Sequence, residues 1–111
     1  AADTDLLETI GKGIERGITV TAPGFYAPQG RQVRAKASFP GLIDDIRSFS
    51  AGKHRITNLE METAGIYALS RVLGHKALSV NAILASRLKF EFAPNPAKII
   101  NQAIELVLSR L

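Results

Sequence analysis

An almost continuously apolar stretch in the last third of the chain constrains the fold more than any other feature. It runs from Lys76 to Ala85, between Gly74 on one side and Ser86-Arg87 on the other. An apolar run of this length, without polar alternation, is typical of a strand that is covered on both faces. Such a strand needs a hydrogen-bonding neighbour on each edge, because its backbone groups are shielded from water. The stretch therefore predicts a central strand in a sheet with helices packed on it.

Apolar periodicity and helix-stop signals predict the remaining elements. In chain order they are a helix capped by Asp3 or Thr4 and ended by Gly17, a strand over Ile18–Ala22, a helix over Leu42–Phe49, a very short strand at Ile56, a helix over Met61–Leu73, and a last helix after Asn95-Pro96. Thr57-Asn-Leu-Glu60 fits a capping box before the third helix. This order predicts an α/β fold with helices on a parallel or mixed sheet. Because only two strands are clear, the chain is expected to supply part of a larger sheet.

Composition excludes several classes of function. The 111 residues include no cysteine, which excludes disulfides, thiolate metal sites and cysteine nucleophiles. No apolar run approaches the roughly 20 residues that cross a bilayer, so we expect a soluble, cytoplasmic protein without a membrane partner. The net charge is +4, but the basic residues are scattered, so nucleic acid is not an expected partner. Neither His54 nor His75 stands at a metal-ligand spacing, and no phosphate-loop or serine-elbow motif is present.

The loop after the first predicted strand carries side chains that suit a planar ligand. Phe25, Gln29 and Arg31 place a flat ring, an amide and a fixed cation within seven residues. A planar heterocycle can stack on the ring, pair its edge with the amide and direct a carbonyl oxygen to the guanidinium. The structural alternative is that Phe25 and Tyr26 fill the edge of the core while Gln29 and Arg31 are solvated.

A second group of candidate residues is Glu60-Met61-Glu62, at the entry to the third helix. One carboxylate could accept hydrogen bonds from two vicinal sugar hydroxyls, and a flexible thioether suits the floor of a pocket. The structural alternative is that Glu60 completes the capping box and that either carboxylate favours the positive end of the helix. The residues alone leave both interpretations of Glu62 open.

Taken together, these segments resemble the C-terminal portion of the hexameric nucleoside phosphorylase family. The resemblance rests on Gly-Phe-Tyr-Ala-Pro-Gln-Gly-Arg, on Asn-Leu-Glu-Met-Glu-Thr-Ala-Gly-Ile-Tyr some thirty residues later, and on Gly74-His-Lys-Ala-Leu and the segments that follow it. The Glu-Met-Glu element is shared across the family, whereas Phe-Tyr-x-x-Gln-x-Arg points to its uridine branch. The resemblance implies a three-layer αβα fold in which residues 1–111 form the C-terminal part of a single domain, with the N-terminal half absent. It also implies a homo-oligomer in which dimers build a hexamer.

The activity implied by the resemblance is reversible phosphorolysis of uridine to uracil and ribose 1-phosphate, with inorganic phosphate as co-substrate and no metal or organic cofactor. The implied base-binding residues are Phe25, Gln29, Arg31 and Arg87, the ribose-binding residues are Met61 and Glu62, and Glu60 is a supporting residue. The family's phosphate-binding residues have no counterpart in this chain, so the chain alone is expected to be inactive.

Two alternatives remain. The chain could be a non-catalytic fragment for nucleoside binding or assembly, because it has no phosphate site. It could also come from a purine phosphorylase or nucleosidase of the same family. The purine branch carries a catalytic Asp after the equivalent of the Val80 strand, where this chain has Ala85-Ser86-Arg87, which favours a pyrimidine substrate.

Overall fold

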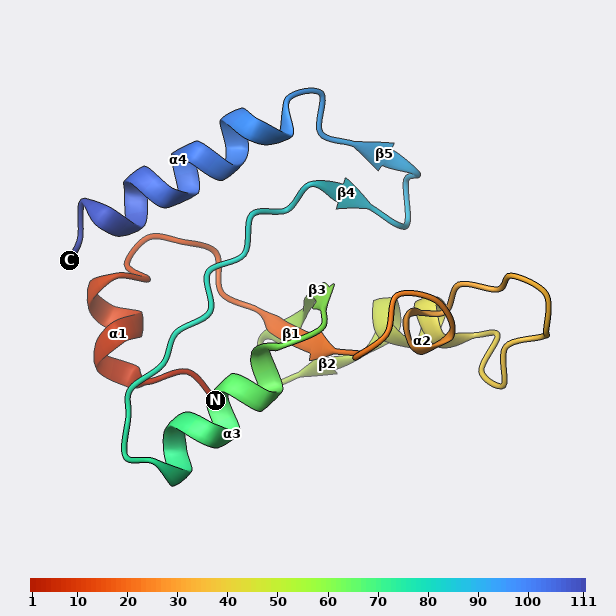
Figure 1. Cartoon of the computed structure of the whole chain (residues 1–111), viewed down its shortest axis with the longest axis horizontal. Helices are drawn as coiled ribbons and strands as arrows, with labels where there is room; N and C mark the ends of the chain where they lie inside the picture. The colour runs from red at the N-terminus through yellow and green to blue at the C-terminus, as the bar shows by residue number, and fades with distance from the viewer. The chain divides into compact units, whose positions relative to one another are not determined.

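The computed structural model describes all 111 residues (Figure 1). They divide into two compact units. One unit is Glu15–Ala68 and holds a small sheet. The other combines Ala1–Ile14 with Leu69–Leu111 and holds helices and a hairpin. Helix α3 (Thr63–Val72) contributes residues to both units. The chain is therefore of the mixed α/β class that the sequence predicts.

The sheet of the first unit is three-stranded and mixed. β1 (Ile18–Thr21) pairs in parallel with β3 (His54–Glu60), and β2 (Ser50–Ala51) pairs with the other edge of β3 in antiparallel orientation. The register places Thr21 opposite Glu60. The two parallel strands therefore end side by side at one edge of the sheet.

The middle strand differs from its prediction. β3 is seven residues long, not the very short strand expected at Ile56, and it includes all of Thr57–Glu60, so the expected capping box is wrong. These residues pair with β1 because β-branched side chains and a neighbouring strand outweigh a local capping signal. Helix α3 accordingly starts at Thr63. The carboxylate of Glu60 still accepts hydrogen bonds from the backbone N–H groups of Glu62 and Thr63, at 2.7 Å each.

Helix α2 (Leu42–Ser48), which the sequence predicts, packs against the loop that follows β1. The short 3₁₀ helix η1 (Ala27–Gln29) ends at Gly30, whose φ of +70° is in the left-handed region. A Cβ at this position would lie 3.5 to 3.6 Å from the side chains of Leu42 and Ile43. The loop is therefore held by a turn that favours glycine and by apolar side chains of α2.

Helix α1 (Thr4–Thr9) opens the second unit and is shorter than predicted. Asp3 caps it as expected, but the chain leaves the helix at two glycines, Gly11 and Gly13, the latter with a φ of +74°, well before Gly17. The guanidinium of Arg110 donates to two backbone carbonyls of this turn, at 2.6 and 2.8 Å. These bonds satisfy carbonyls that a helix end leaves unpaired.

Helix α4 (Pro96–Leu108) begins as the sequence predicts. The side chain of Asn95 accepts a hydrogen bond from the N–H of Lys98 at 3.1 Å, and a proline occupies the first turn. Its apolar residues include Ile104 and Leu108, and both are exposed.

The predicted central strand over Lys76–Ala85 is wrong for this chain. Residues 76–84 form no strand and run between α3 and the hairpin of β4 (Ala85–Ser86) and β5 (Glu91–Phe92) (Figure 1). Their backbone makes isolated hydrogen bonds: the carbonyl of Ala77 accepts from the N–H of Asp3 at 2.9 Å, and that of Leu84 accepts from Ala93 at 2.8 Å. This segment forms no ladder with a strand of either sheet, and strand structure depends on such a ladder as much as on apolar residues. The three-layer arrangement of the family stays a prediction.

Three of the buried residues, Ala22, Gln29 and Thr63, lie beyond the ends of β1 and β3, and Gly11 in the turn after α1 is also buried. Large apolar side chains remain exposed in both units, among them Phe25, Tyr26 and Phe39 in the first and Phe90, Phe92 and Leu111 in the second. No helix combines the length and the apolar character needed to cross a bilayer.

Candidate functional site

The ends of β1 and β3 bring the two predicted ligand-binding segments to one edge of the sheet. β1 ends at Thr21 and continues into the loop that carries Phe25, whereas β3 ends at Glu60. The N–H of Ala22 donates to the carbonyl of Glu60 at 2.8 Å, so the two chain segments leave the sheet together. In open α/β sheets, ligands bind beyond the carboxyl ends of the strands.

Arg31 orders the loop after β1. Its Nη1 donates to Oε1 of Gln29 and to the backbone carbonyl of Phe25, each at 2.6 Å. The guanidinium carbon lies 3.9 Å from the centroid of the Phe25 ring, which is a cation–π contact. Tyr26 meets the same ring edge to face, with centroids 5.3 Å apart. The ring, the amide and the cation are thus fixed relative to one another.

The structural alternative for this loop predicts buried aromatic rings and solvated polar side chains, and the structure shows the opposite. Gln29 is 7% exposed and Arg31 is half-buried, whereas Phe25 and Tyr26 are 54% and 61% exposed. The aromatic rings therefore do not fill the core edge, and the polar groups are not simply solvated. A buried amide needs hydrogen-bond partners, and Arg31 supplies one.

The two carboxylates of Glu60-Met61-Glu62 have different surroundings. Glu60 accepts hydrogen bonds from the hydroxyl of Thr21 and from the backbone N–H groups of Glu62 and Thr63. Burial by itself raises the pKa of Glu60, but these donors and the Thr63 hydroxyl lower it from its ordinary 4.5 to about 2. Glu60 is therefore an ionised carboxylate whose oxygens already accept hydrogen bonds from other groups of the protein.

Met61 and Glu62 form the turn between β3 and α3. Met61 is 40% exposed and Glu62 is also exposed, and the Glu62 carboxylate is not engaged by the donors that surround Glu60. Both side chains are accessible at the sheet edge where the Phe25 loop also begins. The arrangement is compatible with a contact to a polyhydroxy group at this edge.

Thr21 belongs to the same hydrogen-bond network but was not among the predicted site residues. Its hydroxyl donates to Glu60 and accepts from the N–H of Ala64 at 2.9 Å. A polar, β-branched residue at the last position of a predicted strand is the sequence signal that could have indicated it. Its partners lie about forty residues away, so the contacts themselves are not readable from local sequence.

Arg87 is the one predicted base-binding residue outside this unit. It directly follows β4, in the unit formed by Ala1–Ile14 and Leu69–Leu111, and it is half-buried. Its contact with a base stays a prediction.

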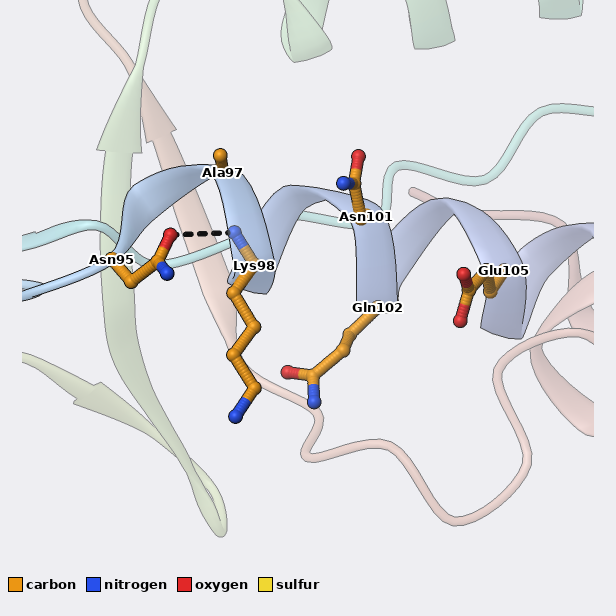
Figure 2. Close-up of a pocket in the computed structure, with 6 residues that line it drawn as sticks. All are labelled: Asn95, Ala97, Lys98, Asn101, Gln102 and Glu105. Atoms are coloured by element: carbon orange, nitrogen blue, oxygen red, sulfur yellow. Dashed lines mark hydrogen bonds between the residues drawn. The ribbon is translucent and has the colours of Figure 1, made fainter.

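A shallow depression of about 450 Å³ lies along α4 (Figure 2). Its lining residues are Asn95, Ala97, Lys98, Asn101, Gln102 and Glu105. All six come from one helix and its cap, so no second wall encloses a ligand, and none is a predicted site residue. No group of three or more His, Asp or Glu side chains is arranged to hold a metal ion. The sheet edge is therefore the better candidate site.

Comparison with known proteins decides the family. Residues 1–109 match the family described as the phosphorylase superfamily. The chain belongs to this superfamily. A curated uridine phosphorylase from Thermococcus kodakarensis is 32% identical over 108 residues, a match that covers 90% of this chain and 37% of that relative. The chain thus spans little more than a third of the length of this phosphorylase.

The family resemblance stated from the sequence motifs is confirmed by these two matches. A search of solved structures found no match.

Proposed function

We propose that this chain supplies the base-binding and ribose-binding part of a nucleoside phosphorylase that acts on uridine. The observation that carries the proposal is the parallel pairing of β1 with β3, which brings the Phe25 loop and the Glu-Met-Glu turn to one sheet edge. Membership of the phosphorylase superfamily and the similarity to a uridine phosphorylase support it.

In this proposal the loop recognises uracil. Phe25 offers its exposed ring to the base and the sugar, and Gln29 pairs with the polar edge of the base. Arg31 exchanges its contact with Gln29 for one with a uracil carbonyl, because a guanidinium has five N–H donors in a fixed plane. A contact of Arg87 with the base is part of the proposal because the family resemblance implies it.

The turn recognises ribose. Glu62 accepts hydrogen bonds from the 2′ and 3′ hydroxyls, and Met61 packs against the sugar. Glu60 holds the turn from behind, because its own oxygens are occupied by Thr21 and by backbone donors.

The proposed reaction is displacement at C1′ of the ribose. A phosphate oxygen forms a bond to C1′ while the bond from C1′ to the uracil nitrogen breaks, and that electron pair leaves with uracil. Gln29 and Arg31 stabilise the negative charge that develops on the base. No residue of this chain is assigned to phosphate. The three-layer fold, a hexamer built from dimers and a cytoplasmic location accompany this proposal.

The test combines binding with turnover. We expect uridine to bind the 111-residue chain in calorimetry, and we expect no release of uracil from uridine with or without phosphate. Inosine serves as the control for a purine preference. Absence of uridine binding would contradict the proposed site, tighter binding of inosine would favour the purine branch, and phosphate-dependent release of uracil would contradict the assignment of phosphate to residues outside the chain.

A further inference from the structure

One hydroxyl, that of Thr21, bridges three structural elements. It lies at the end of β1, donates to the carboxylate of Glu60 at the end of β3, and accepts from the N–H of Ala64 in the first turn of α3 at 2.9 Å. Both bonds reach residues about forty positions away. The Thr21 side chain is half-buried, so these bonds are partly shielded from water.

The partners of Thr21 flank the Met61-Glu62 turn on both sides. Glu60 directly precedes the turn, and Ala64 follows it after one residue. The N–H groups that donate to Glu60 hold the turn to Glu60 itself, but they do not tie it to β1. Among side chains, the Thr21 hydroxyl makes that tie at both ends of the turn.

We propose that Thr21 is a positioning residue for ribose recognition, because its hydroxyl fixes the turn that carries Met61 and Glu62 relative to the end of β1. This inference rests on the proposed function. The hydrogen bonds of the Thr21 hydroxyl go to Glu60 and Ala64, whereas Arg31 contacts Phe25 and Gln29 within the loop itself. Loss of the hydroxyl therefore affects recognition of the sugar and spares recognition of the base.

The same strand offers a matched control. Thr19 lies two residues earlier on the same face of β1, and its hydroxyl donates to Oδ1 of Asn58 on β3 at 2.8 Å. This bond also joins β1 to β3 across part-buried surface, but it does not reach the turn.

The experiment measures uridine and uracil affinity by calorimetry for the wild-type chain, Thr21→Val, Thr21→Ser and Thr19→Val. Thr21→Val keeps the shape of the side chain and removes its hydroxyl. We expect it to weaken uridine binding about five- to tenfold, because the turn loses both of its hydrogen bonds to the Thr21 hydroxyl, and to leave uracil binding within about twofold. Thr21→Ser restores uridine binding, and Thr19→Val leaves the ratio of the two affinities unchanged.

Equal losses of uridine and uracil affinity in Thr21→Val, or the same change of ratio in Thr19→Val, would overturn the inference by showing a merely structural role. Failure of the wild-type chain to bind uridine would instead defeat the proposed function, and this inference with it. A measurement without ligand tests separately whether the Thr21 hydroxyl holds the start of α3. Hydrogen exchange of the Ala64 amide should be faster in Thr21→Val than in Thr19→Val, and equal rates in the two variants would also overturn the inference.

Discussion

Gln29 and Arg31 stand two residues apart and are hydrogen-bonded to each other, so the loop presents them as one recognition unit. Replacing Gln29 with Ala should weaken uridine binding by about 1 to 3 kcal/mol, because the polar edge of uracil loses its hydrogen-bond partner. Calorimetry with uridine measures the effect. Gln32→Ala is the matched control, since that side chain is exposed beyond the pair and should leave the affinity unchanged. An unchanged affinity in Gln29→Ala would remove this residue from the site.

Glu60 gives the chain a specific pH dependence. Its pKa is about 2 in the folded state against an ordinary value of 4.5, so the folded state favours the ionised carboxylate. The stability that this preference supplies is complete above pH 4.5 and is lost as the pH falls toward 2.

Glu60→Gln should therefore unfold more easily than the wild-type chain at pH 6, and the difference should shrink as the pH falls from 4.5 to 2. Urea unfolding across this range measures the difference, and Glu62→Gln controls for removal of an exposed carboxylate. A difference that stays constant with pH would show that the hydrogen bonds of Glu60 do not favour its ionised form.

Residue types alone indicate much of this candidate site. The ring, amide and cation of the Phe25 loop, and the carboxylates of Glu60 and Glu62, all stand out in the sequence. Two features do not. The burial of Gln29 is a tertiary property that residue types do not show. The bond of Thr21 to Glu60 depends on the register between β1 and β3, which joins residues 39 positions apart.

At the level of elements, the starts of α1 and α4 follow their capping residues, whereas the start of α3, the length of β3 and the absence of a strand over residues 76–84 are not predicted. α4 begins after Asn95, as its cap and proline indicate. The apolar residues of 76–84 carry an equally strong signal for a strand, yet a strand forms only where another strand supplies its hydrogen bonds. Thr57–Glu60, which the sequence predicts as a helix cap, likewise belongs to β3, because it pairs with β1.

Two glycine substitutions should change stability in opposite directions. A Cβ on Gly17, just before β1, would lie 2.8 Å from the Cβ of Thr57 and would overlap the rest of that side chain. Gly17→Ala should therefore lower the free energy of unfolding by about 1 to 3 kcal/mol. Gly65 lies within α3 and has nothing within 4 Å of its Cβ position, so Gly65→Ala should raise that free energy by about 0.5 to 1 kcal/mol.

Denaturant unfolding of both variants tests this pair. Thr57→Ala in the Gly17→Ala background removes most of the overlap and should recover part of the lost stability. Equal effects of Gly17→Ala and Gly65→Ala would show that the space around Gly17 has no influence on folding.

The whole chain consists of two compact units, and one of them, Glu15–Ala68, holds every predicted site residue except Arg87. Large apolar side chains stay exposed in both units.

The chain matches 37% of the length of its uridine phosphorylase relative. Uridine phosphorolysis is therefore proposed for a whole protein, whereas nucleoside binding is proposed for this chain. The division into two compact units could not be predicted from the sequence. The periodicity of apolar residues indicates which face of a helix or strand is buried, but not which elements pack against each other.

The proposed uridine site lies where β1 and β3 end. The most direct test is a uridine titration followed through the backbone amide resonances of the isotope-labelled chain. We predict that the shifts concentrate in residues 22–31 and 60–64 and leave the α4 depression, residues 95–105, unchanged. Shifts concentrated along α4, or no shifts at saturating uridine, would contradict a uridine site at the ends of β1 and β3.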